Sequence, residues 1–104
     1  MSDRELLELA AKAAGIADLQ QVGNIWYYTN GGYLMREWNP LTDDGDALRL
    51  AVKLSINVFY RENINGVFVI ADREVGEVTP WYDPYAATRR AIVRAAAEIG
   101  KEMK

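Results

Sequence analysis

Apolar residues near the start of the chain recur at the spacing of an α-helix. The stripe consists of Leu6, Leu9, Ala10 and Ala13. Ser2 stands three residues before Glu5, which is the spacing of a capping box, and Gly15 follows the stripe where a left-handed residue commonly ends a helix. These signals predict a helix over residues 3–14.

The next segment has the features of two strands and a tight turn. Residues 25–28 are rich in aromatic side chains, which suit a half-buried strand. Residues 33–38 alternate between two faces, one of which holds Leu34, Arg36 and Trp38. The turn residues 29–32, Thr-Asn-Gly-Gly, tolerate the positive φ angles of a hairpin. We predict a hairpin here, and 16–21 is a connector to which we assign no shape.

A second helix is predicted after Pro40, which ends the strand because proline cannot donate to a ladder. Thr42 is placed to cap this helix, so that Asp43 and Asp44 fall in its first turn, where the helix dipole favours anions. Its apolar face consists of Ala47, Leu50, Ala51 and Leu54, widened by Leu48 and Val52. A face this wide predicts burial on more than one side.

Strand patterns return after this helix. Residues 55–61 alternate, 62–66 form a turn, and 67–71 are apolar on both faces, which is typical of a central strand. We predict a third strand around 77–79, at an edge of the sheet.

Asp83 and Pro84 open a final helix, since Asp is a favoured N-cap and proline is favoured at the first helical position. We predict that Gly100 caps its end, and its many alanines predict close approach to another backbone segment. Its predicted buried stripe is Tyr85, Thr88, Ile92, Ala95 or Ala96, and Ile99.

Together these elements follow the order α-ββ-α-ββ(β)-α. They predict an α+β fold in a single domain over 1–104: a three-layer α/β/α sandwich whose mainly antiparallel sheet has four or five strands. The order hints at an internal repeat, although the two halves show no convincing sequence similarity.

The amino-acid composition excludes several kinds of functional site. Half of the residues are apolar, 26% are charged and the net charge is −3, with neither Cys nor His. Disulfides, thiol nucleophiles, Cys/His zinc sites and Ser-His-Asp triads are therefore excluded. No apolar run approaches the ~18 residues of a membrane span, and the polar, acidic residues 1–5 lead us to expect neither a secretory signal nor a transit peptide. We expect a cytoplasmic protein that is not an enzyme and uses no cofactor.

The acid cluster Asp43, Asp44 and Asp46 has two interpretations. Clustered carboxylates bind Mg²⁺ or Ca²⁺, but this spacing does not match the calcium loop. Acids in the first turn of a helix complement its dipole without any metal. We favour the helix start and keep, as the alternative function, a small metal-dependent hydrolase or nuclease that uses these three residues.

Positive charge is densest at Arg89, Arg90 and Arg94 on the final helix. This face predicts an anionic partner, although a solvated helix face explains the same residues. Nucleic acid is an unlikely partner because the chain is acidic overall and has no nucleic-acid-binding motif. The aromatic residues could bind a partner, but we expect most of them to pack in the core. They include Trp26, Tyr27, Tyr28, Tyr33, Trp38, Trp81, Tyr82 and Tyr85.

Two runs carry a family resemblance. Residues 38–54, WNPLTDDGDALRLAVKL, and 83–96, DPYAATRRAIVRAA, resemble the corresponding segments of the phage ABA sandwich domain family, small phage and prophage proteins. With the opening helix, the resemblance covers most of the chain. It implies a sheet between helical layers and a phage origin, but no established activity. We therefore expect a small phage or prophage accessory protein in the bacterial host cytoplasm, which binds a phage or host protein or another anionic partner.

Overall fold

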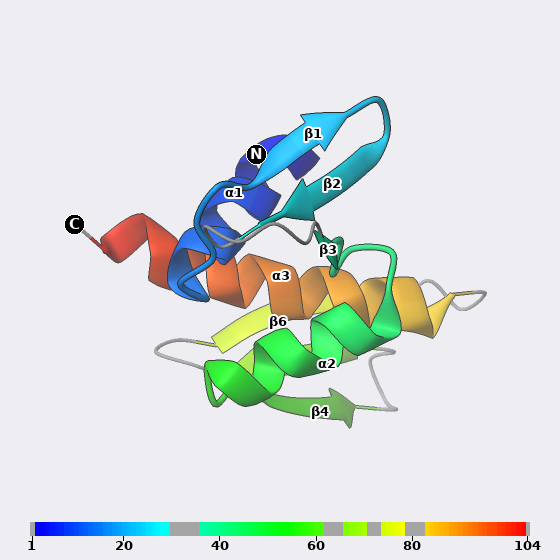
Figure 1. The fold of residues 1–104 in the computed structure, drawn as a ribbon. Helices are drawn as coiled ribbons and strands as arrows, with labels where there is room; N and C mark the ends of the chain where they lie inside the picture. Colours follow the sequence, from blue (N-terminus) through cyan, green and yellow to red (C-terminus); the bar gives the residue numbers. More distant parts are fainter. Residues whose placement is uncertain (1, 30–35, 62–65, 71–73, 79–82, 104) are drawn as a thin grey trace.

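Three helices alternate with strands that pair as two three-stranded antiparallel sheets (Figure 1). The computed structural model describes residues 2–29, 36–61, 66–70, 74–78 and 83–103, of which 59–61, 66–70 and 74–78 are described by their backbone alone. The elements are α1 (Asp3–Ala13), β1 (Gln20–Val22), β2 (Ile25–Tyr28), β3 (Arg36–Glu37), α2 (Asp44–Lys53), β4 (Asn57–Arg61), β5 (Gly66–Ile70), β6 (Glu74–Val78) and α3 (Pro84–Glu102). Within these residues, no helix is both long enough and apolar enough to cross a membrane.

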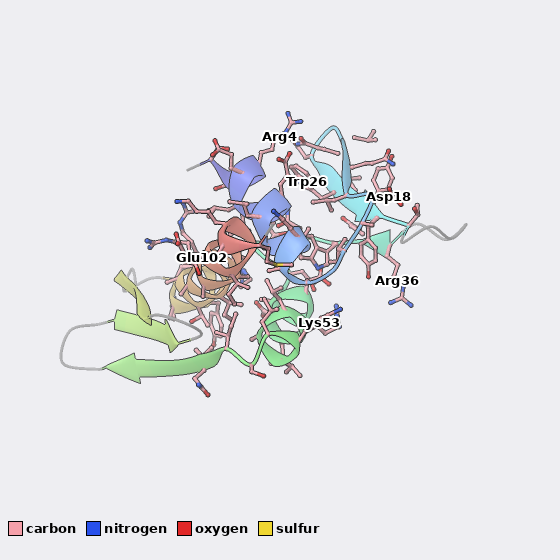
Figure 2. All side chains as sticks on the ribbon, turned by 90° about the vertical axis from the view of Figure 1, so that its left-hand side faces the viewer. Arg4, Asp18, Trp26, Arg36, Lys53 and Glu102 are labelled. Carbon is pink, nitrogen blue, oxygen red and sulfur yellow. The ribbon has the colours of Figure 1, made fainter. Side chains whose placement is uncertain are left out.

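The helices lie between the two sheets, as both views show (Figures 1 and 2). Helix α3 packs against α1, α2, β5 and β6. The α+β class is thus confirmed, whereas a single four- or five-stranded sheet with helices on both faces is not. The first sheet, β1-β2-β3, has only one covered face: Trp26 on β2 is buried and its neighbour Ile25 is exposed. A sheet with one apolar face needs a helical layer on that side only.

The first sheet contains a strand that the sequence analysis missed. β1 pairs with β2, and the two-residue turn Gly23-Asn24 joins them, with Gly23 at φ +61°. A Gly-Asn pair between apolar Val22 and Ile25 is a hairpin signal, because glycine adopts positive φ without steric cost. The predicted pairing of 25–28 with 33–38 is confirmed where 27–28 pair with 36–37. Residues 30–35, which include most of the predicted turn and the start of the second predicted strand, lie outside the described residues.

The second sheet follows the prediction closely. β5 lies between β4 and β6, so the predicted central strand is central and the predicted third strand is at an edge. β6 covers Glu74–Val78, slightly earlier than the predicted 77–79, of which Thr79 lies outside the described residues, as do 62–65 of the turn.

The two sheets repeat each other with an offset of 40 residues. In the first sheet Gln20 pairs with Tyr27, and in the second Tyr60 pairs with Val67. The same shift relates the Tyr27–Glu37 pair to the Val67–Glu77 pair. The three helices follow this spacing too, with Ala11, Ala51 and Ala91 at equivalent buried positions. The hinted repeat is therefore present as two helix-plus-three-strand units, which we call the first and second unit, followed by α3.

The ends of α1 and α2 also match. Gly15 and Ser55 both have positive φ, and Ile16 and Ile56 donate from their backbone N–H groups to the carbonyls of Ala11 and Ala51. This is the Schellman arrangement, in which a left-handed residue ends the helix. At the start of α1, the backbone N–H of Glu5 donates to Ser2 Oγ over 3.2 Å, so the predicted cap is confirmed.

Helix α2 begins one residue later than predicted. The backbone N–H of Asp46 donates to Asp43 Oδ2 over 2.8 Å, so Asp43 is the cap rather than Thr42, whose backbone N–H closes a turn onto the Asn39 carbonyl. The prediction that Leu48 and Val52 widen the buried apolar face is also wrong. They are 64% and 71% exposed, because only one stripe of α2 faces inward.

Helix α3 begins as predicted, with Asp83 accepting from the backbone N–H of Ala86, but its buried stripe differs. Ile92, Ala95 and Ala96 are buried as predicted, but Tyr85 is 70% exposed. The small residues that face inward extend beyond the predicted ones. They are Ala87, Ala91, Ala95, Ala96, Ala97 and Gly100. Gly100 lies inside the helix and does not end it, and a Cβ at Gly100 would overlap the carbonyl of Leu9. Close contact between α1 and α3 therefore selects small side chains, as the alanines predict.

Candidate functional site

The predicted arginine face is used largely within the fold. Arg89 is well buried for an arginine: its Nε donates to the Leu41 carbonyl over 2.9 Å and its Nη1 to Asp44 Oδ1 over 2.7 Å. Arg90 Nη1 lies 3.3 Å from Asp3 Oδ1, and Arg94 is half-buried. Arg89 and Arg90 thus join α3 to the start of α2 and to the start of α1.

The acid cluster is also engaged in local structure. Asp43 caps α2, and Asp44 accepts from Arg89. Asp46 is buried; it accepts from the backbone N–H of Asn39 over 2.9 Å and from Arg49 Nη2 over 2.7 Å. These partners support the helix-start interpretation. Within the described part of the chain, no group of three or more metal-ligating side chains is positioned to hold an ion.

Alternation along β2 and β3 places four side chains on the inner face of the first sheet. Trp26 and Trp38 are buried there, and the backbone N–H of Trp38 donates to the Trp26 carbonyl over 2.8 Å. Tyr28 and Arg36 are direct partners across the strands, and side chains of paired residues share a face. The expected core role holds for the two tryptophans, while Trp81 and Tyr82 lie outside the described residues.

A pocket of about 400 Å³ lies where this inner face meets α2. One wall is a single face of α2, with residues at the i, i+3, i+4 and i+7 positions: Asp46, Arg49, Leu50 and Lys53. The opposite wall contains Tyr28, Arg36 and Trp38, and the end of α1, 14–16, forms the third. Glu37 also contributes, but strand alternation directs its side chain to the other face of the sheet.

The charge of the pocket is positive. Arg49 donates a hydrogen bond to Asp46, and this bond, together with the charges of Asp46 and Asp43, raises the pKa of Arg49. The same bond holds the exposed guanidinium in place. Arg36 and Lys53 form no salt bridge within the described part of the chain. Figure 2 shows both residues on the side where the first sheet and α2 meet. Two cations without carboxylate partners thus border one cavity.

A smaller pocket of about 340 Å³ lies between the starts of α2 and α3. Arg89 lines this pocket but already forms a salt bridge with Asp44. The other large side chain that lines it is the exposed Tyr85, at the start of α3. This pocket offers an anion no uncommitted positive charge among the described residues.

The sequence analysis missed the site around Arg36, Arg49 and Lys53. It placed Arg36 with Trp38 on one strand face and named neither Arg49 nor Lys53 as a site residue. The available signal was the spacing of Arg49 and Lys53, four residues apart and thus on one helix face. Which strand face meets which helix face is a tertiary property that this spacing does not contain.

No protein-family model, curated protein or solved structure matches this chain. The resemblance to the phage ABA sandwich family therefore stays a prediction.

Proposed function

We propose that this protein is a small binding protein that captures an anionic group in the pocket between α2 and the first sheet. The observation that supports this function is the arrangement of Arg36 and Lys53 on opposite walls of one cavity, without salt-bridge partners in the described part of the chain. Its volume falls within the range of small-molecule sites, about 300–1,000 Å³. The resemblance in 38–54 and 83–96 supports an accessory role for a phage or prophage in the cytoplasm of its host.

Comparison of the two units supports a functional rather than a packing role for the polar residues of α2 that line the pocket. At the positions of α1 that correspond to the pocket face of α2, the side chains are apolar: Leu6, Leu9, Ala10 and Ala13. In α2 these positions hold Asp46, Arg49, Leu50 and Lys53. A buried aspartate at the position of a buried leucine loses apolar burial, and such departures from packing rules concentrate at functional sites.

A binding role also agrees with the side chains present. The chain has no His and no Cys, so acid–base chemistry near neutral pH would depend on strongly shifted carboxylates, lysines or tyrosines. The alternative hydrolase or nuclease gains no support from Asp43, Asp44 and Asp46, because their carboxylates are occupied by a helix cap, Arg89 and Arg49.

The test is an NMR titration of isotope-labelled protein with inorganic phosphate and, separately, acetate. We expect the largest amide shift changes at Gly15, Trp38 and Lys53, which line the pocket. The double variant Arg36→Gln/Lys53→Gln should weaken binding at least about tenfold, since charge-assisted contacts are the strong ones. Raising the salt concentration should weaken it as well, because exposed charges are screened.

A matched control removes the same two charges elsewhere. Arg4→Gln/Lys101→Gln changes two exposed residues outside the pocket, Arg4 at the start of α1 (Figure 2) and Lys101 at the end of α3. Its binding should equal that of the unchanged protein. Shift changes that centre on Arg90 and Arg94 would return the site to the final helix, and the absence of binding by either anion would refute the proposed function.

A further inference from the structure

We infer that the pocket selects small organic anions in which a flat ring adjoins the charged group, such as an aromatic carboxylate or an aryl phosphate. This inference rests on the proposed function and adds the ligand class. It follows from the position of an aromatic side chain beside an uncommitted cation on the same wall.

Tyr28 and Arg36 are that pair. They are cross-strand partners in the β2–β3 ladder, so their side chains lie next to each other on the inner face. Tyr28 is half-buried and lines the pocket, and the buried Trp26 and Trp38 occupy the next paired positions along the same face. A half-buried ring supported by packed neighbours is a rigid platform on which a second ring can stack.

The opposite wall supplies the complementary charge. Lys53 lies in the last turn of α2, one helical turn from Arg49, and its ammonium lies about 4 Å from the position of a Cβ on Gly15. Asp46 holds Arg49, so, among the described residues, the ammonium of Lys53 and the guanidinium of Arg36 are the groups left for the ligand. An anion between them places an attached ring next to Tyr28.

The shape of the pocket favours a small ligand over a chain. Residues from the end of α1, from β2, from 36–38 and from α2 line it, and its volume of about 400 Å³ holds one ring with its charged group. A nucleic acid or an acidic peptide would need a basic surface that extends beyond the pocket. Instead, Asp43 lies next to the pocket, with its carboxylate 3.9 Å from Arg49, and the chain has a net charge of −3.

The experiment compares matched pairs of anions by NMR titration or calorimetry: phenyl phosphate with inorganic phosphate, and benzoate with acetate. Each pair differs only by the ring, and stacking on an aromatic side chain is strong enough to raise affinity at least about fivefold. We expect this ring preference in both pairs.

Variants at Tyr28 assign the preference. Tyr28→Phe keeps the ring and should keep the ring preference, whereas Tyr28→Leu should bind phosphate as before but lose the preference for phenyl phosphate. Equal affinity within both pairs would overturn the inference and leave the proposed function standing. A ring preference that survives in Tyr28→Leu would overturn the assignment to Tyr28. If none of these anions bound, the proposed function itself would fail.

Discussion

The first and second units have the same arrangement of helix and strands, yet their helices carry different side chains at equivalent positions. Equivalent strand pairs have the same register, and both helices end in a left-handed residue followed by an isoleucine. The inward positions are the same in both helices. In α1 they are filled by Leu6, Leu7, Ala10, Ala11 and Ala14, and in α2 by Asp46, Ala47, Leu50, Ala51 and Leu54. The backbone hydrogen bonds and the spacing of the inward positions are therefore the same in both units, whereas the side chains at these positions differ.

The difference has a structural cause. Helix α1 approaches α3 so closely that Gly100 has no room for a side chain. Helix α2 leaves a pocket against the first sheet, and its polar face lines that pocket. A helix packed against a neighbouring backbone requires small apolar residues, whereas a helix beside a cavity can hold charges. Three sets of substitutions test this account of the two units.

The largest effect is expected from exchanging residues at one equivalent position. Leu50→Ala should lower the free energy of unfolding by about 2–5 kcal/mol, because it empties a buried site. Ala10→Leu should lower it by about 1–3 kcal/mol, because added methylenes have no space next to α3. Urea denaturation measures both. Leu48→Ala is the control on the same helix and, since Leu48 is exposed, should change stability by less than about 0.5 kcal/mol.

If Ala10→Leu proved neutral, the two helices would be packed alike and the comparison would lose its basis.

A smaller effect is expected at Gly100. Replacing a glycine inside a helix by alanine usually stabilises it by up to about 1 kcal/mol. Here Gly100→Ala should instead destabilise the protein by about 1–3 kcal/mol, because the new methyl group would overlap the Leu9 carbonyl and force α1 away. A thermal melt at matched concentration would detect the change. A rise in melting temperature would show that the two helices lie further apart than described.

The smallest effects on stability are expected at the left-handed residues that end α1 and α2. Ser55→Gly should stabilise the protein by about 0.5–1 kcal/mol, and Gly15→Ala should destabilise it by about 1 kcal/mol, since a left-handed residue with a Cβ is strained. The two substitutions should change the free energy of unfolding in opposite directions, although they lie at equivalent positions. Chemical denaturation measures both changes. Two changes of the same sign would contradict the equivalence of the helix ends.

Much of the secondary structure could be predicted because it depends on local signals. Ser2 and Asp83 cap helices at the predicted positions, and β5 was expected to be central from its apolar sequence. The stripe of α3 was predicted correctly at Ile92, Ala95 and Ala96 but not at Tyr85. Burial usually favours large residues, whereas here close helix contact buries further alanines and leaves Tyr85 outside. The cap of α2 was misplaced because Thr42 and Asp43 both have suitable side chains and only the turn at Asn39 decides between them.

The layers and the pocket could not be predicted by the same means. The repeat was hidden because equivalent positions share a spacing and few identical residues. The pocket joins 14–16, Tyr28, 36–38 and one face of α2, and their meeting depends on how a sheet and a helix are placed in space. Periodicity places Arg36 on a strand face and Lys53 on a helix face, but it does not say that the two faces oppose each other.

The contact between α1 and α3 sets an order of events during synthesis. Asp3 and Arg90, which join the two helices, are 87 residues apart in the chain. At about 5–20 residues per second, α1 leaves the ribosome several seconds before its partner exists. During that interval the inward leucines of α1 are uncovered, so the nascent chain is most exposed to aggregation and to chaperones before α3 emerges.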